Sequence, residues 1–242
     1  MSSGFRLPSS INRKIGRAMH DFTMFADGDR VLVAVSGGVD SLVLAVVLRL
    51  WQNKAPIAFT LVPYHVDHGF WRDAPGSDGP EESIAKQLTP WQLSLTIAPE
   101  RSISEGERTC FFCARNRRNQ LFEAARSLGC NRVAVGHHKD DLIETLLLNA
   151  FYSGNLSTMV PRQDLFAGKL SLVRPLAYLE KSEVAQLAER LELVPVKNLC
   201  PLSVDTRREK VRALLAGIYA EEPQVKGSLF SALHNVRRDY LL

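Results

Sequence analysis

A short apolar run that passes straight into a glycine-containing turn constrains the fold of this chain more than any other feature. Residues 31–35 read Val-Leu-Val-Ala-Val, residues 36–41 read Ser-Gly-Gly-Val-Asp-Ser, and residues 42–51 have a helical pattern. Glycine lets a backbone approach a phosphate, and a helix N-terminus faces the anion with N–H groups. The segment therefore predicts a phosphate-binding loop made by Ser36, Gly37, Gly38, Val39, Asp40 and Ser41.

This loop differs from the two commonest nucleotide-binding signatures. Its spacing does not fit GxxxxGK[ST], and the chain contains no GxGxxG. Ser36 and Ser41 can add hydroxyl donors, while Asp40 can hold a cation or orient the first helical turn. The loop instead resembles that of ATP pyrophosphatases, which split ATP into AMP and pyrophosphate.

The rest of the chain alternates between strand patterns and helix patterns. We expect strands over residues 30–35, 57–62, 93–97, 132–135 and 170–173, and helices over 40–51, 81–88, 113–128, 140–151, 180–191 and from 206. Residues 154–168 read as a polar connection. This alternation favours a Rossmann-like α/β fold, with a parallel sheet, helices on both faces and ligands at the C-terminal strand ends. The loops after Val35, Val62 and Val135 should then meet around one site.

A second motif, Gly-His-His-Lys-Asp-Asp at residues 136–141, lies between a predicted strand and a predicted helix. Its side chains should face the same pocket as the first loop. Asp140 and Asp141 can also stabilise a helix N-terminus by about 0.3–1 kcal/mol each, which is the structural alternative for the carboxylates. We add Gly136 to the nucleotide-binding residues, and the catalytic candidates are Asp40, His137, His138 and Asp141.

Three of the four cysteines suggest a metal site. Cys110 and Cys113 have C-x-x-C spacing, and Cys200 lies much further along the chain. Three thiolates make a poor closed zinc site, but they suit a [4Fe–4S] cluster with one iron left open. The spacing alone is equally consistent with a second interpretation, in which the C-x-x-C is inert and Cys200 is unrelated to it. Cys130 follows Gly129 and enters an apolar strand, so it reads as an ordinary buried thiol.

The motifs together resemble those of tRNA 2-thiocytidine synthetases, which are iron–sulfur-dependent thiolases of the ATP pyrophosphatase (PP-loop) group. The resemblance rests on the Ser36–Ser41 loop, Cys110-x-x-Cys113-Ala-Arg-x-Arg-Arg, Gly136-His-His-Lys-Asp-Asp-x-x-Glu-Thr-Leu, Val173-Arg-Pro-Leu-Ala-Tyr and Asn198-Leu-Cys200. It implies an adenine nucleotide alpha hydrolase-like fold. It also implies ATP with Mg²⁺, a [4Fe–4S] cluster held by Cys110, Cys113 and Cys200, a tRNA substrate, and a homodimer.

The reaction that the resemblance implies is replacement of the C2 oxygen of an anticodon-loop cytidine by sulfur. A carbonyl oxygen is a poor leaving group, and transfer of AMP to it makes it a good one. The Ser36–Ser41 loop would hold the pyrophosphate end of ATP, while Asp40 and Asp141 would assist magnesium or adenylation. His137 or His138 would stabilise charge or transfer a proton. Sulfide on the open iron would then attack C2; the sequence does not identify the sulfur donor.

Two departures keep other functions open. The family loop commonly has Lys where this chain has Val39, and His65-Val-Asp-His68-Gly looks more like a motif of tRNA lysidine synthetases. A lysidine synthetase-like ligase is therefore the second interpretation. Further alternatives are a nucleotide-binding protein with a structural C-x-x-C zinc site, and an ATP-dependent ligase or amidotransferase acting on a small acid.

The charge of the chain permits a polyanionic partner without requiring one. The 242 residues carry a formal net charge of +4, and the chain contains no apolar run long enough to cross a membrane. We expect a cytoplasmic protein with no membrane partner and one domain over residues 1–242, with an N-terminal extension (1–28) and a C-terminal helical section (about 204–242). The candidate RNA-binding residues are Arg115, Arg117, Arg118, Arg207 and Arg208, and a solvated helix face is the alternative.

Overall fold

The computed structural model describes residues 4–69, 79–101, 109–196, 200 and 207–240. The chain folds into two compact units. Residues 1–138 and 161–203 form the first, here called the sheet unit, and residues 139–160 and 204–242 form the second, the helical unit. The C-terminal helices thus belong to the same unit as a segment from the middle of the chain, a grouping that the sequence pattern does not indicate.

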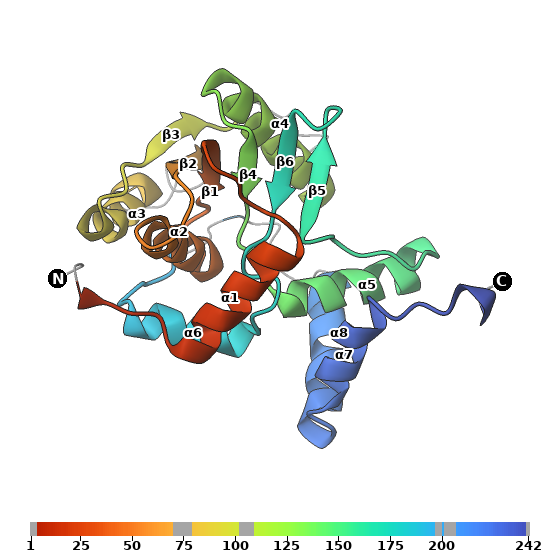
Figure 1. The fold of residues 1–242 in the computed structure, drawn as a ribbon. Helices are drawn as coiled ribbons and strands as arrows, with labels where there is room; N and C mark the ends of the chain where they lie inside the picture. Colours follow the sequence, from red (N-terminus) through yellow and green to blue (C-terminus); the bar gives the residue numbers. More distant parts are fainter. Residues whose placement is uncertain (1–3, 70–78, 102–108, 197–199, 201–206, 241–242) are drawn as a thin grey trace. The chain divides into compact units, whose positions relative to one another are not determined.

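The sheet unit contains a six-stranded sheet with the order β3-β2-β1-β4-β6-β5 (Figure 1). Its strands are β1 (Asp29–Ala34), β2 (Phe59–Asp67), β3 (Thr96–Pro99), β4 (Arg132–Ala134), β5 (Arg162–Leu165) and β6 (Leu170–Val173). All neighbouring pairs are parallel except β5 and β6. The predicted parallel α/β sheet is therefore confirmed, with one antiparallel strand at its edge.

Strand β5 corrects the expectation that residues 154–168 form only a connection. The turn between β5 and β6 has positive φ angles at Phe166, Ala167 and Gly168. Such a short link cannot make the crossover that a parallel pair needs, so β5 must run antiparallel to β6. The polar residues of β5, Arg-Gln-Asp, hide this edge strand from a search for apolar runs.

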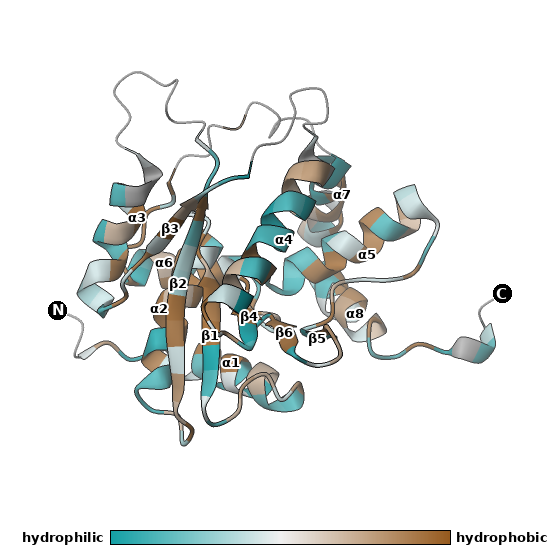
Figure 2. Cartoon of the chain, turned by 90° about the horizontal axis from the view of Figure 1, so that it is seen from above, coloured by the Kyte–Doolittle hydropathy of each residue, from teal (hydrophilic) through white to brown (hydrophobic). Residues whose placement is uncertain are grey.

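Helices cover both faces of the sheet, as predicted. On one face lie α1 (Ser9–Asp21), α2 (Val39–Gln52), α3 (Pro80–Leu88), which continues into a 3₁₀ turn at Thr89–Trp91, and α6 (Lys181–Arg190). On the other face lies α4 (Cys110–Ser127), a largely hydrophilic helix in Figure 2. Val31 and Val33 pack toward the first group, whereas Leu32 packs toward α4, because successive side chains of a strand point to opposite faces.

The register of the strands aligns one apolar row beneath α4. Leu32 pairs with Val62 on one side and with Val133 on the other, and Val133 pairs with Leu172. These side chains form a single cluster with Leu121 and other residues of α4. The row gives a hydrophilic helix enough apolar contact to hold it against the sheet.

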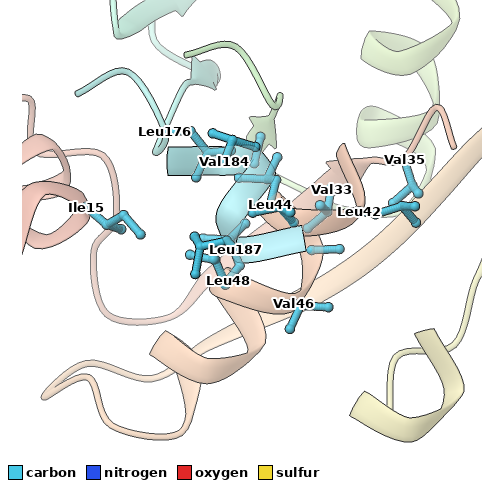
Figure 3. Packing of buried hydrophobic residues seen from close by; sticks show 14 of the residues in the cluster. Ile15, Val33, Val35, Leu42, Leu44, Val46, Leu48, Leu176, Val184 and Leu187 are labelled. Carbon is cyan, nitrogen blue, oxygen red and sulfur yellow. The ribbon is translucent and has the colours of Figure 1, made fainter. Parts of the chain in front are cut away.

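Helix α2 is the centre of the largest core. Every residue from Ser41 to Leu48 is buried, because α2 lies between the sheet and the helices α1 and α6. Figure 3 shows Leu44 and Leu48 of α2 close to Val184 and Leu187 of α6. The predicted N-terminal extension contributes α1 to this core through Ile11, Ile15 and Ala18. The packing therefore fixes α2, and the loop before it, against three neighbouring elements.

The helical unit consists of α5 (Lys139–Ser153), α7 (Arg207–Glu221), α8 (Val225–Ala232) and a 3₁₀ turn at Arg238–Tyr240. Its buried apolar cluster is small, with Ile143 of α5 against Val211 and Leu215 of α7. Among the described residues of the chain, no helix combines the length and the apolar character needed to span a bilayer.

Two element boundaries differ from the predicted ones in ways that affect the site. Strand β2 continues through Pro63 to Asp67, beyond the predicted end at residue 62. Its last residues include His65 and Asp67, whose polarity makes the segment look like a loop. Helix α4 begins at Cys110 rather than near residue 113, because Thr109 caps it.

Candidate functional site

The predicted anion loop lies where the strand order changes direction. From β1 the chain proceeds to β2 and β3 on one side, and it then returns to β4 on the other side of β1. Ligands of open α/β sheets bind outside the carboxyl ends of strands at such a switch point. The loops that follow β1 and β4, residues 35–38 and 135–138, are the two predicted motifs.

Hydrogen bonds around Ser41 hold the loop in a tight turn. The Ser41 hydroxyl donates to the carbonyl oxygen of Gly38 at 2.7 Å and accepts from the backbone N–H of Ser36 at 3.1 Å. The hydroxyl of Ser36 lies 3.2 Å from that of Ser41. Ser41 is buried and Ser36 is exposed. Ser41 therefore shapes the loop, while Ser36 is the hydroxyl that solvent reaches.

The two glycines of the loop serve different purposes. Gly37 has a φ of +85°, and a Cβ there would lie 3.1 Å from Ile84 Cδ1 and 3.2 Å from Val196 Cβ. Gly37 is needed for conformation and for close packing. A Cβ at Gly38 would meet only Ser36 Oγ at 3.5 Å, so this position faces open space. Gly38 precedes the first turn of α2 without a side-chain cap, which leaves backbone N–H groups directed toward that space.

The second motif touches the first at the level of the backbone. A Cβ on Gly136 would lie 2.8 Å from both the carbonyl carbon and the carbonyl oxygen of Asp40, and 3.1 Å from the backbone nitrogen of Ser41. No side chain fits in that space. The structure therefore brings Gly136 together with the Ser36–Ser41 loop, as the predicted meeting of the loops requires.

Among the described residues, Lys181 and His138 are the charged or titratable side chains that lie beside Asp40. Both of its carboxylate oxygens accept from the ammonium of Lys181, at 2.7 and 2.8 Å. His138, which is buried, places Nε2 at 3.9 Å from Asp40 Oδ1. Lys181 is the first residue of α6 and lies 141 positions from Asp40 in the sequence. No motif points to Lys181, because only the packing of α6 on α2 brings it to the loop.

His137 is oriented by a buried arginine. Arg174 Nε donates to His137 Nδ1 at 3.1 Å, and Arg174 is only 4% exposed. Because a guanidinium is a donor only, Nδ1 must accept, and the proton of the neutral ring lies on Nε2. His137 is therefore a hydrogen-bond donor at Nε2. Arg174 belongs to the Val173-Arg-Pro-Leu segment, in which no local pattern points to this role.

The end of β2 is connected to the end of β1. His65 Nδ1 donates to the carbonyl oxygen of Val35 at 2.7 Å, and Asp67 accepts from the N–H of Gly69 at 2.8 Å. His68 Nδ1 lies 2.9 Å from the buried carboxylate of Glu100. The prediction that a loop after Val62 reaches the site is corrected in position, since β2 continues and the loop starts after Asp67.

The cysteine motif lies at the N-terminus of α4. The Thr109 hydroxyl accepts from the N–H of Phe112 at 3.2 Å and caps the helix, so that Cys110 and Cys113 are one turn apart. Desolvation lowers the pKa of Arg117, one turn further along, while negative charge on Glu100, Cys113 and Cys200 acts to raise it. Cys113 and Cys200 are distant in sequence, yet both lie within electrostatic range of the same guanidinium. The side chain of Cys110 lies outside the described residues.

Cys130 is in a different environment. It is buried among the apolar residues beneath α4, and burial raises the pKa of its thiol above the usual range. A protonated, apolar-packed thiol is a poor metal ligand. Among the described side chains, no group of three or more His, Cys, Asp and Glu residues is arranged to hold a metal ion.

The helical unit contains the remaining acidic candidate. Asp141 and its neighbour Glu144 are buried on α5. Arg208 contacts both carboxylates, at 3.3 and 3.4 Å, and Arg212 contacts Glu144 at 2.8 Å. Asp141, a predicted catalytic residue, and Arg208, a predicted RNA-binding residue, therefore form an ion pair with each other.

The other predicted RNA-binding arginines are exposed. Arg115, Arg117 and Arg118 are exposed on α4 in the sheet unit. Arg207 is exposed on α7 in the helical unit, with its guanidinium 4.8 Å from the centre of the Tyr152 ring. The assignment of these arginines to RNA stays a prediction.

Comparisons with known proteins agree with this geometry. Residues 7–216 match the PP-loop domain family. A tRNA-cytidine(32) 2-sulfurtransferase of Anaeromyxobacter sp. is 40% identical over 98% of this chain and 82% of its own length. A protein of the same name from Geobacter sulfurreducens is 39% identical over 96% of this chain and 91% of its own length.

Solved structures show the same fold. The U34-tRNA thiolase NcsA from Methanococcus maripaludis, solved with its [4Fe–4S] cluster, superposes with a TM-score of 0.74 at 22% identity, covering 93% of this chain and 77% of its own. NAD⁺ synthetase from Burkholderia pseudomallei gives a TM-score of 0.50 at 14% identity, covering 95% and 92%. With the two sequence motifs in contact and full-length relatives near 40% identity, the chain belongs to the PP-loop family and, within it, to the tRNA-cytidine 2-sulfurtransferases.

Proposed function

We propose that this protein is an ATP-dependent tRNA thiolase that replaces the C2 oxygen of cytidine 32 with sulfur. The cytidine oxygen attacks the α-phosphorus of ATP and releases pyrophosphate, and a sulfur nucleophile then attacks C2 and releases AMP. The observation that carries the proposal is the backbone contact of Gly136 with Asp40 and Ser41, which joins the two PP-loop motifs into one site. The names of the full-length relatives supply the substrate.

The Ser36–Ser41 loop would hold the pyrophosphate end of ATP. The open space at Gly38 lies at the N-terminus of α2, where uncapped N–H groups and the helix dipole favour an anion. Ser36 adds an exposed hydroxyl, and Ser41 fixes the turn from inside.

Asp40, His137 and His138 would surround the reacting phosphate. Asp40 is the carboxylate that we assign to a magnesium ion, since it is partly exposed beside the loop. His137 carries its proton at Nε2 and would donate a hydrogen bond to a phosphate oxygen. His138 lies next to Asp40 and would stabilise charge on the reacting phosphate or transfer a proton there. Asp141 is assigned to the same chemistry by its motif; its described contacts are with Arg208 and Arg212.

The cysteines would hold a [4Fe–4S] cluster. Cys113 and Cys200 share Arg117 as a neighbour, and Cys110 precedes Cys113 by one helical turn. Three ligands on two separate segments fit a cluster with one open iron, and the guanidinium of Arg117 would offset part of the negative charge of the thiolates that hold it. When bound, this group would carry the sulfur that replaces the oxygen, and a separate sulfur donor would supply that sulfur.

A homodimer is the assembly that we propose. Leu214 and Ile218 are large apolar residues exposed on α7. Exposed apolar side chains on one helix are a common feature of interfaces between copies. Light scattering should give twice the mass of one chain, and Leu214→Glu with Ile218→Glu should give the monomer mass; a monomeric unmodified protein would refute this assembly.

The central test combines iron content with tRNA thiolation. Protein purified anaerobically should be brown, contain about four irons per chain, and thiolate tRNA only with ATP. Changing Cys110, Cys113 or Cys200 to Ala should remove the iron and the activity, and Cys130→Ala is the matched control that should retain both. A colourless sample with stoichiometric zinc would contradict the cluster.

A second experiment tests the nucleotide site independently of the cluster. Gly38→Val should abolish ATP binding measured by calorimetry, because the β-branched side chain fills the space proposed for phosphate. Asp40→Asn should weaken the binding of magnesium at the nucleotide site. Both variants should keep the iron content of the parent protein, and unchanged ATP affinity in Gly38→Val would mean that the loop is only structural.

A further inference from the structure

The phosphate-binding loop contains no basic side chain. Residues 36–41 are Ser, Gly, Gly, Val, Asp and Ser, and the residue directly before Asp40 is the apolar Val39. ATP carries several negative charges, whereas a helix N-terminus offers only about half a positive charge. Asp40 adds a negative charge to the same place. A magnesium ion at Asp40 would offset part of this charge, and a basic side chain from another part of the chain would offset more of it.

Lys181 is the side chain that the fold supplies. Its ammonium contacts both oxygens of Asp40, at 2.7 and 2.8 Å, so it lies beside the first turn of α2. The side chain of Lys181 is 47% exposed and that of Asp40 is 31% exposed. A ligand at the loop can therefore reach the ammonium without any change in packing.

The position of Lys181 is fixed by two features of α6. Glu180 and Glu183 form a capping box that holds the first turn of the helix. Val184 and Leu187 then pack into the same core as Leu44 and Leu48 of α2 (Figure 3). The helix that presents the lysine is thus packed against the helix that presents the loop. Its flexible side chain needs to move only from the carboxylate to a neighbouring phosphate.

We infer that Lys181 is a phosphate-binding residue of this enzyme, supplying to the pyrophosphate part of ATP the positive charge that the loop lacks. The ammonium lies against the carboxylate of Asp40, beside the loop. This inference rests on the proposed function, because it requires that ATP binds there. It predicts a contact with the β- and γ-phosphates, which AMP does not have.

Calorimetry with ATP and with AMP tests this role. Lys181→Ala should weaken ATP binding about 10- to 100-fold, the usual effect of losing a hydrogen bond between charged groups, and should leave AMP binding within about twofold. Lys181→Arg should retain most of the affinity. Lys86→Ala is the matched control, because Lys86 forms an ion pair of similar length, 2.7 Å, with Glu82 on α3. It should leave both affinities unchanged.

A rescue experiment separates a phosphate contact from a structural role. Val39→Lys places a cation inside the loop, and Val39→Lys combined with Lys181→Ala should regain ATP affinity relative to Lys181→Ala alone. If Lys181→Ala weakens ATP and AMP equally, or neither, the inference is wrong, since the lysine then only holds α6. If the unmodified protein binds no ATP, the proposed function itself fails, and this result is distinct from the others.

Discussion

The two units of this protein are stabilised in different ways. In the sheet unit, two layers of buried apolar side chains pack against a six-stranded sheet. In the helical unit, the fully buried apolar cluster is Ile143, Val211 and Leu215, and beside it lie the buried carboxylates Asp141 and Glu144. One unit depends mainly on apolar burial, whereas the other combines a small core with ion pairs. The hydrophobic contribution per residue must therefore be smaller in the helical unit.

The two acidic candidates, one in each unit, also differ in their exposure and in their charged partners. Asp40 in the sheet unit is partly exposed and contacts one lysine, so a ligand can compete for it. Asp141 in the helical unit is buried and lies near two arginines. Removing a buried charge leaves its partners unbalanced, which costs stability as well as any function. We therefore expect a substitution at Asp40 to alter ligand binding, and one at Asp141 to alter folding too.

The largest expected effect comes from the same substitution made in both cores. Leu44→Ala should destabilise the protein by about 2–5 kcal/mol, because the cavity forms in a closely packed layer. Leu215→Ala should cost near the lower end of that range, about 2 kcal/mol, since fewer buried neighbours surround it. Calorimetric unfolding and hydrogen exchange measure both. Exchange should rise in the sheet unit for Leu44→Ala and in α5, α7 and α8 for Leu215→Ala; identical exchange patterns would remove the distinction between the units.

The next effect concerns the contact between the two motifs in the sheet unit. Gly136→Ala should destabilise by about 1–3 kcal/mol, because its Cβ would lie 2.8 Å from backbone atoms of Asp40 that cannot move aside. ATP binding should fall with it. Gly217→Ala in the helical unit is the control, since nothing lies within 4 Å of a Cβ there. An Ala at residue 136 that leaves both the melting temperature and ATP affinity unchanged would disprove the contact.

A smaller effect separates the arginines of the two units. Replacing Arg117 and Arg118 by Ala should weaken tRNA binding and reduce the slope of log affinity against log salt, by about 0.7–0.9 for each phosphate that the protein no longer neutralises. Arg208→Ala should instead destabilise the helical unit by up to about 1 kcal/mol, because its partly exposed guanidinium contacts Asp141 and Glu144. Filter binding at three salt concentrations and thermal unfolding measure the two effects. A reduced slope in Arg208→Ala with unchanged stability would place RNA on α7 instead.

The smallest effect is a difference in thiol reactivity within the sheet unit. Burial raises the pKa of Cys130, so less of it is thiolate at a given pH. In protein without a cluster, iodoacetamide should modify the partly exposed Cys113 and Cys200 faster than the buried Cys130, whose modification should need a higher pH or unfolding. Mass spectrometry of the alkylated peptides gives the rates. Fast modification of Cys130 at neutral pH would contradict its burial beneath α4.

Local sequence patterns are sufficient to predict most of the fold. Strand β6 has the predicted bounds, 170–173, because it is a short apolar run between turn residues. Helix α4 ends where Gly129, with a φ of +66°, predicts a stop. Strand β5 escapes prediction since its side chains are polar, and the end of β2 does so because His65 and Asp67 interrupt the apolar run. Periodicity reports burial, and it gives little information where a strand is at an edge or approaches a site.

The sequence by itself determined the motifs, their order and the family, because the short Ser-Gly-Gly-x-Asp-Ser and C-x-x-C patterns are set by local backbone and ligand requirements. Only the tertiary structure decided which distant side chains complete them. Lys181 reaches Asp40, Arg174 orients His137, and Cys200 shares Arg117 with Cys113. These partners are far apart in sequence, and no local propensity records them. They meet because burial of the apolar faces of the strands and helices fixes where each element lies, and polar residues at or near the ends of different elements then come together.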